Sequence, residues 1–127
     1  DEINFSIFSV PEFIKWIAVI ILVTGVLIIS VSYIQLGTNL RLGLPQDGEY
    51  TSLQKNGIYK ISRNPIYIGF FLMLLASSLY VINPFNWVCA VTGVIIHHKQ
   101  ILAEEVFLKQ RFGKEWTDYK NKVNRYL

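Results

Sequence analysis

Residues 16–40 read WIAVIILVTGVLIISVSYIQLGTNL and contain no charged side chain. The hydrocarbon core of a bilayer is about 30 Å thick and is crossed by roughly 20 apolar residues in an α-helix. We therefore predict a first membrane-spanning helix over residues 13–36. A secretory signal peptide does not fit, because Asp1, Glu2 and Glu12 make the preceding flank acidic and the apolar run exceeds the usual length of about 7–15 residues.

A second uncharged stretch covers residues 64–98 and is too long for a single spanning helix. Asn83-Pro84 interrupts it, and proline ends a helix while the Asn-Pro pair favours a turn. The pattern predicts a helical hairpin with legs at 66–82 and 85–102. We therefore expect an all-α, multi-pass membrane protein with three spanning helices. The alternative is a soluble helical bundle whose central helices are buried.

The composition agrees with a membrane protein and excludes several other classes. Charged residues make up 17% of the chain, against about 25% in a typical soluble domain. A net charge of +3 with 52% apolar residues excludes disorder, and the single cysteine, Cys89, excludes a disulfide scaffold. At 127 residues the chain is expected to form a single domain, 1–127.

Basic residues gather in two polar segments, the connection 37–65 and the tail 103–127, whereas the segment before the first span is acidic. Positively charged segments of membrane proteins lie on the cytoplasmic side. We therefore expect the N-terminus outside, both polar segments in the cytoplasm, and a location in the bacterial inner membrane or its equivalent. Because the basic residues follow the membrane topology, no nucleic-acid partner is expected. Turns are predicted at 44–48 and at Asn56-Gly57.

The tail is expected to form an amphipathic helix. Its apolar and aromatic residues recur at intervals of three and four, the period of one helix face: Phe112, Trp116, Tyr119, Val123 and Tyr126. Gly113 is expected to separate this helix from the preceding one. A basic amphipathic helix beside a span lies in the membrane interface or covers the membrane domain. Docking without any further role is the alternative.

Segment 56–69 carries the first candidate site. Pro65 suits the first position of a helix, which makes Asn64 the N-cap. The N–H groups and the dipole of such a helix start favour a carboxylate or a phosphate, and Tyr59 and Tyr67 flank it. The alternative is a capped helix start within a belt of interfacial tyrosines.

Glu104 and Glu105 form the second candidate site, just past the third predicted span. We expect one acid to pair with Lys109 and the other to face the membrane. A carboxylate at that depth is a functional hypothesis, with a cationic ligand as its partner. His97 and His98 diverge by about 100° on a helix, so we interpret them as interfacial residues and expect no metal site.

With these elements in place, the sequence resembles the isoprenylcysteine carboxyl methyltransferase family and, more loosely, the phospholipid methyltransferases. The resemblance runs from about residue 36 to the C-terminus, with the order and spacing typical of the family. The matching positions are Gly57, Tyr59, Arg63, Asn64, Pro65, Tyr67, Gly69, Asn83, Pro84, Glu104, Glu105, Leu108, Phe112, Gly113, Trp116, Tyr119, Val123 and Arg125.

The resemblance implies an integral membrane enzyme that methylates an amphiphilic substrate, similar to protein-S-isoprenylcysteine O-methyltransferase. It implies S-adenosylmethionine as methyl donor, S-adenosylhomocysteine as product, no metal, a surrounding lipid bilayer, and a lipophilic or lipidated acceptor. Carried over position by position, the cofactor-binding residues are Thr51, Ser52, Leu53, Gln54, Tyr59, Arg63, Asn64, Pro65, Ile66, Tyr67, Glu104 and Glu105.

Two departures from the family pattern bear on the acceptor. Asn64 replaces the histidine of many members, and Gln100 stands near where prenylcysteine-methylating enzymes place an arginine that holds the substrate carboxylate. Glu104 and Arg111 are the candidate catalytic residues, and Gln100 and His98 are the candidate substrate residues. A phospholipid or lipid-amine N-methyltransferase is one alternative function, and a non-catalytic membrane adaptor that docks through its tail is another. Because few helices precede the motifs, we expect a homodimer or a further N-terminal helix to complete the pocket.

Overall fold

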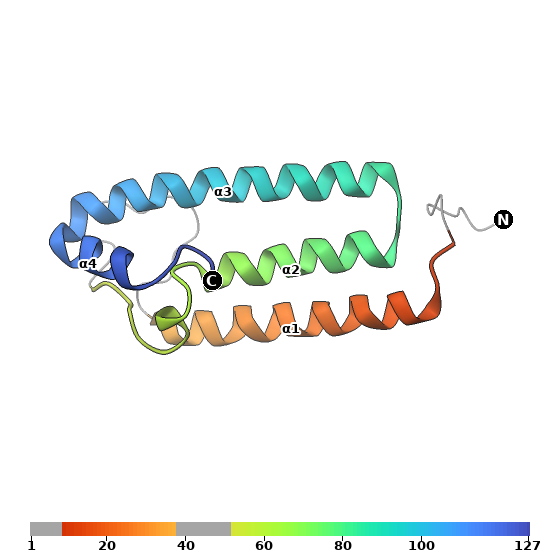
Figure 1. Cartoon of the computed structure of the whole chain (residues 1–127), viewed down its shortest axis with the longest axis horizontal. Coiled ribbons are helices and arrows are strands. Elements are labelled where there is room, and N and C mark those ends of the chain that lie inside the picture. Colours follow the sequence, from red (N-terminus) through yellow and green to blue (C-terminus); the bar gives the residue numbers. More distant parts are fainter. Residues whose placement is uncertain (1–8, 38–51) are drawn as a thin grey trace.

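The computed structural model describes residues 9–37 and 52–127, and within these residues the chain is helical without a strand. The all-α prediction is therefore confirmed. In Figure 1 the three longest helices run along the long axis of the molecule, and the shorter elements gather at one end. The elements are α1 (Glu12–Leu36), the 3₁₀ helix η2 (Gly57–Lys60), α2 (Pro65–Tyr80), α3 (Pro84–Phe112) and α4 (Lys114–Lys122).

Small residues bring α1 and α2 close together. Ala18, Gly25 and Ser32 are the buried residues of α1, and intervals of seven place them on one helix face. A Cβ atom at Gly25 would lie 2.9 Å from the backbone oxygen of Gly69 on α2, closer than carbon and oxygen normally approach. The two glycines therefore permit a backbone contact that larger side chains would prevent, as in tightly packed membrane helices.

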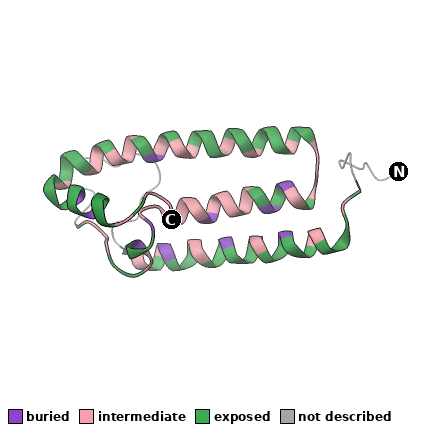
Figure 2. Cartoon of the chain, viewed as in Figure 1, coloured by how far each residue is buried: buried purple, intermediate pink, exposed green. Residues whose placement is uncertain are grey.

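The outer surface of the bundle is apolar, and Figure 2 shows the outward faces of α1 and α3 as largely exposed. Trp16, Ile20 and Leu27 of α1 are 60–66% exposed, as is Val88 of α3 at 64%. Among the described residues, α1 is the one helix that is both long and apolar enough to cross a bilayer, and α2 is apolar but shorter. The total of three spans stays a prediction.

The predicted hairpin turn at Asn83-Pro84 is confirmed. Pro84 is the first residue of α3, and the side-chain oxygen of Asn83 accepts a hydrogen bond from the Phe85 N–H at 2.8 Å. The Asn86 amide donates to the Ser77 carbonyl at 3.0 Å, which ties the start of α3 to the end of α2. At the other end, α3 stops at Gly113, whose φ of 56° ends the helix as predicted.

The tail differs from the prediction beyond Lys122. Trp116 and Tyr119 of α4 are buried, at 4% and 5% exposure, as the amphipathic pattern requires. The helix then ends, because Val123 is extended, and Tyr126 at the end of the predicted stripe lies outside it. The reason is long-range hydrogen bonding: the carbonyl oxygen of Asn124 accepts the Arg63 N–H at 3.0 Å, a contact that a continuing helix would not offer.

Candidate functional site

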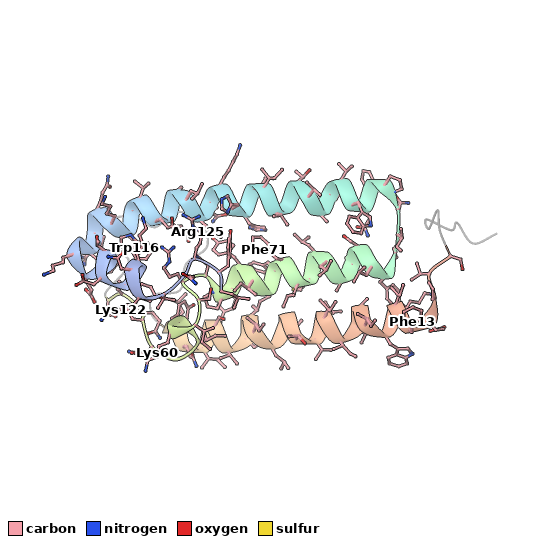
Figure 3. All side chains as sticks on the ribbon, in the orientation of Figure 1. Phe13, Lys60, Phe71, Trp116, Lys122 and Arg125 are labelled. Atoms are coloured by element: carbon pink, nitrogen blue, oxygen red, sulfur yellow. The ribbon has the colours of Figure 1, made fainter. Side chains whose placement is uncertain are left out.

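A cavity of about 340 Å³ lies where the start of α2 and the second half of α3 meet η2 and α4. Small-molecule sites typically measure about 300–1,000 Å³, so this cavity has the size of a binding site. Figure 3 labels Trp116 of α4, which lines it, and Arg125 nearby. The lining residues are Tyr33, Leu36, Ser52, Leu53, Gln54, Tyr59, Arg63, Asn64, Pro65, Ile66, Tyr67, Phe70, His97, Gln100, Glu104, Leu108, Trp116 and Tyr119.

Gln35, at the end of α1, contacts the segment before α2, which forms one wall of the cavity. Its side-chain oxygen accepts a hydrogen bond from the Ile58 N–H at 2.6 Å. Gly57 lies directly against it with φ of 64°, and a Cβ atom there would fall 2.3 Å from that oxygen. Only glycine meets both the positive φ and the close approach. The predicted turn at Asn56-Gly57 is confirmed by the hydrogen bond from the Tyr59 N–H to the Asn56 carbonyl. The predicted turn at 44–48 lies outside the described residues.

Tyr59 joins three parts of the chain at this wall. Its hydroxyl donates to the Ser32 carbonyl of α1 at 3.3 Å, and its own carbonyl accepts from the Tyr119 hydroxyl of α4 at 2.6 Å. Burial raises the pKa of Tyr119, so this hydroxyl keeps its proton and remains a donor. η2 is therefore fixed between α1 and α4 at the edge of the cavity.

The start of α2 lies where the sequence predicts it, at Pro65, but Asn64 does not cap it with its side chain. The Asn64 amide donates instead to the Arg125 carbonyl at 3.1 Å, and the same carbonyl accepts from the Ser62 hydroxyl at 3.3 Å. The positive end of the α2 dipole thus meets a cavity lined by Asn64, Pro65 and Ile66 without a side-chain cap.

Glu105 is the centre of an ion cluster behind the cavity. It accepts hydrogen bonds from Arg125 Nε at 2.9 Å and Arg125 Nη2 at 3.0 Å, and its Oε1 lies 3.1 Å from Arg63 Nη1. The expectation that one acid of the pair contacts Lys109 is wrong for this residue. The α3 face that carries Glu105 meets the segment after α4, so two arginines distant in sequence replace the local partner.

The side chain of Arg63 is buried beside the cavity at 6% exposure, and its Nη1 belongs to the ion pair with Glu105. Its Nε has no hydrogen-bond partner among the described residues. The guanidinium carbon lies 5.2 Å from the centre of the Trp116 ring. Burial lowers the pKa of Arg63, while the charge of Glu105 raises it. A buried cation in a residue that lines the cavity suits an anionic group of a ligand.

Glu104 has a different environment from Glu105, although the two are adjacent. Its Oε1 accepts a hydrogen bond from the Tyr67 hydroxyl at 2.8 Å, and it lines the cavity. No described lysine, arginine or histidine forms an ion pair with it. Burial raises the pKa of Glu104, and the Tyr67 hydrogen bond partly offsets that rise. An acid without a cationic partner in a cavity suits a cationic ligand group.

One face of α3 supplies a row of four lining residues: His97, Gln100, Glu104 and Leu108. Their intervals of three, four and four are those of a single helix face. His97 is therefore also a lining residue of the cavity, and its interpretation as an interfacial residue stays a prediction. His98 points elsewhere, with its Nδ1 2.7 Å from the Tyr126 hydroxyl.

Most of the residues proposed from the sequence converge on this cavity. Glu105, Arg111 and His98 do not line it, and Arg111 is exposed near the end of α3. Thr51 lies outside the described residues. The proposed residues that do line it are Ser52, Leu53, Gln54, Tyr59, Arg63, Asn64, Pro65, Ile66, Tyr67, Gln100 and Glu104. The lining residues not proposed are Tyr33, Leu36, Phe70, His97, Leu108, Trp116 and Tyr119.

Comparison with known proteins gives a consistent set of relatives. The phospholipid methyltransferase family model matches residues 13–115. The Dictyostelium discoideum protein-S-isoprenylcysteine O-methyltransferase is 31% identical over 114 residues, covering 85% of this chain and 46% of the relative. A probable protein-S-isoprenylcysteine O-methyltransferase of Oryza sativa subsp. indica is 27% identical over 119 residues, covering 91% of this chain and 61% of the relative. The chain thus spans about half the length of these curated relatives.

Proposed function

The chain belongs to the phospholipid methyltransferase family, and from this premise we propose that it is an integral membrane enzyme that uses S-adenosylmethionine to methylate an amphiphilic, lipid-like substrate. One observation carries the proposal. The cavity contains Glu104, an acid that pairs with no cation of the described residues, and the buried Arg63, within aromatic walls. S-adenosylmethionine carries an ammonium, a carboxylate, a sulfonium and an adenine, and each of these groups has a chemical match among the lining residues.

Glu104 is the proposed partner of the ammonium. The Tyr67 hydroxyl holds one carboxylate oxygen at 2.8 Å, which orients the group while leaving its second oxygen to a ligand. Burial of the acid makes its charge costly in the free protein, and a bound cation would compensate for that cost. The same carboxylate therefore contributes more to binding than an exposed acid would.

Arg63 and the start of α2 are the proposed partners of the carboxylate. The arginine contributes its positive charge and an unpaired Nε, and the start of α2 at Pro65, which has no side-chain cap, adds the positive end of its dipole. Trp116 packs against the guanidinium at 5.2 Å and limits its movement. Arg63 therefore combines ion pairing to Glu105 through Nη1 with a positive charge for a ligand.

Aromatic side chains are the proposed surface for the adenine and the sulfonium. Tyr59, Tyr67, Trp116 and Tyr119 all line the cavity, and Tyr119 packs edge-on against Trp116 at 5.9 Å between ring centres. Aromatic faces attract cations and stack with flat rings. When bound, the cofactor supplies a methyl group on a cationic sulfur. The protein then has to hold donor and acceptor in line and exclude water, and such positioning accounts for much of the acceleration of a displacement reaction.

The proposed enzyme sits in the membrane with its cavity on the cytoplasmic side. The apolar outer faces of α1 and α3 support contact with lipid, and the basic residues of the polar segments support the orientation. Relatives named for isoprenylcysteine suggest a lipidated acceptor. A phospholipid or lipid amine is the second candidate, because Gln100, and not an arginine, lines the cavity on α3.

Calorimetry with S-adenosylhomocysteine on detergent-purified protein tests the proposal. We expect binding that Glu104→Gln weakens at least tenfold, because the ammonium loses its counterion. Asp118→Asn on α4, which removes an exposed acid outside the lining residues, is the matched control and should leave the affinity within twofold. No binding by the wild-type protein at millimolar ligand would overturn the enzyme proposal and favour a non-catalytic adaptor. If the wild-type protein binds the ligand, transfer of a labelled methyl group into a membrane lipid or peptide would identify the acceptor.

A further inference from the structure

We propose that Arg125 is a positioning residue for the ligand: it balances the charge of Glu105 and thereby leaves the positive charge of Arg63 to the carboxylate of the bound cofactor. The inference rests on the proposed function and adds to it a residue that lies outside the cavity lining. Arg125 acts through Arg63 and does not itself touch the ligand.

Three charged side chains form a group behind the cavity. Arg125 Nε lies 2.9 Å from Glu105 Oε1 and Arg125 Nη2 lies 3.0 Å from Glu105 Oε2, so this arginine pairs with both carboxylate oxygens. Such two-pronged pairs are among the strong hydrogen bonds of proteins. Arg63 Nη1 lies 3.1 Å from the same Oε1. The group therefore carries one excess positive charge, and of its three members Arg63 is the one that lines the cavity.

The two arginines repel each other across the acid that they share. The side chain of Arg63 is 6% exposed and that of Glu105 13%, so water screens their charges weakly. Burial lowers the pKa of Arg63, the charge of Glu105 raises it, and the charge of Arg125 lowers it again. An additional anion close to Arg63 would relieve this repulsion, which favours the binding of a negatively charged group.

The charges balance once the proposed ligand is bound. Arg63 and Arg125 then face two carboxylates, that of Glu105 and that of the ligand. Without the charge of Arg125, the two carboxylates would share Arg63 alone, and a buried acid without a counterion is costly. Arg125 should therefore strengthen binding of the ligand carboxylate, but not of the ammonium, whose proposed partner is Glu104.

The end of the chain holds Arg125 in this place. Its carbonyl oxygen accepts hydrogen bonds from the Ser62 hydroxyl at 3.3 Å and from the Asn64 amide at 3.1 Å. The preceding carbonyl, that of Asn124, accepts the Arg63 N–H at 3.0 Å. The backbone is thus fixed to the loop before α2, and the Arg125 side chain reaches from there to α3.

Calorimetry with two ligands tests the proposal on the full chain in detergent. S-adenosylhomocysteine carries the carboxylate, whereas decarboxylated S-adenosylhomocysteine lacks it and keeps the ammonium and the adenosine. Arg125→Gln should weaken binding of S-adenosylhomocysteine about tenfold, which corresponds to about 1.4 kcal/mol, and leave binding of the decarboxylated compound within twofold. A purely structural role would weaken both ligands alike. The ratio of the two affinities therefore separates the roles, and a ratio that Arg125→Gln leaves unchanged would overturn the inference.

Two further variants separate the charge of Arg125 from its hydrogen bonds. Arg125→Lys keeps the charge but loses the two-pronged pair, and its affinity ratio should stay within threefold of wild type. The double variant Glu105→Gln/Arg125→Gln removes the acid together with its partner, so Arg63 keeps its charge for the ligand and the wild-type ratio should return. In either variant, a ratio as low as that of Arg125→Gln alone would contradict the inference.

Lys122→Gln is the matched control, because it removes a positive charge close to Arg125 in sequence from an exposed position outside the cavity lining. Both of its affinities should stay within twofold of wild type. Equal affinity of the wild-type protein for the two ligands would refute the inference and leave the proposed function intact. Failure of the wild-type protein to bind either ligand would instead overturn the proposed function.

Discussion

Glu104 and Glu105 are neighbours on α3, yet Glu104 accepts a hydrogen bond from Tyr67 at the cavity while Glu105 pairs with Arg63 and Arg125 behind it. Successive residues on a helix diverge by about 100°, which sends the two carboxylates to different surroundings. One acid of the pair thus faces the cavity and the other belongs to the ion cluster, and substitution can separate the two.

Glu105→Gln is expected to destabilise the protein by about 3 kcal/mol, because it leaves the buried Arg63 without its counterion. Glu104→Gln should not have this effect. Burial raises the pKa of Glu104, so its charged form is disfavoured in the folded state, and a neutral amide should leave stability at neutral pH equal or higher. Thermal unfolding of both variants in detergent measures the difference, and equal losses would contradict this division of roles.

Affinity for S-adenosylhomocysteine is expected to rise with pH above 4.5. Burial raises the pKa of Glu104 from its ordinary value of 4.5, so part of the free protein carries a neutral acid in this range. Binding of an ammonium requires the carboxylate and releases that proton, and the gain in affinity ends once the pH exceeds the raised pKa. Calorimetry in two buffers of different ionisation enthalpy detects the released proton. The Glu104→Gln variant should release none, and an affinity that grows as the pH falls would argue against the assignment.

Gly69→Ala is expected to destabilise the bundle by about 1–3 kcal/mol through overpacking. Its Cβ would lie 2.3 Å from Ile29 Cγ1 and 2.8 Å from the Gly25 oxygen, so α1 and α2 would have to separate. Gly93→Ala on α3 is the matched control, because its Cβ would meet the flexible end of Leu74 at 3.1 Å. Unfolding temperatures in detergent compare the two, and similar shifts would refute the close contact of α1 and α2.

Cysteines placed at Lys55 or Lys120 should resist an impermeant thiol reagent in intact cells and react after permeabilisation, because both positions belong to the predicted cytoplasmic segments. Cys89 is exposed and must first be replaced by alanine. Ser9→Cys, on the predicted outer side, is the positive control. Labelling of the Lys120→Cys variant in intact cells would reverse the orientation.

The helices and much of the site were predictable because local rules govern them. Proline at positions 65 and 84 starts a helix, and Gly113 ends one, by restrictions on their own backbone. His97, Gln100, Glu104 and Leu108 share one helix face by their intervals of three and four, and this spacing connects His97 to Glu104. Metal-ligand spacing, by contrast, does not single out His97.

The errors lie where distant segments meet. The partner of Glu105 was expected one turn along its own helix, but Arg125 is 20 residues away. The end of α4 is likewise set by contacts of Asn124 with Arg63 rather than by the pattern of the tail. Apolar residues such as Leu36 were assigned to a span because nothing local distinguishes a cavity wall from a lipid-facing surface.

The hydrogen bond between Ser62 and Arg125 has a consequence for biosynthesis. The two residues are 63 positions apart, so at elongation rates of about 5–20 residues per second Ser62 is made several seconds before its partner. By the time Arg125 is made, α1, α2, α3 and α4 have all been translated. The cavity is therefore completed last. A nascent chain arrested before residue 124 would contain the helices but would lack the hydrogen bonds from Ser62 and Arg63 to the end of the chain.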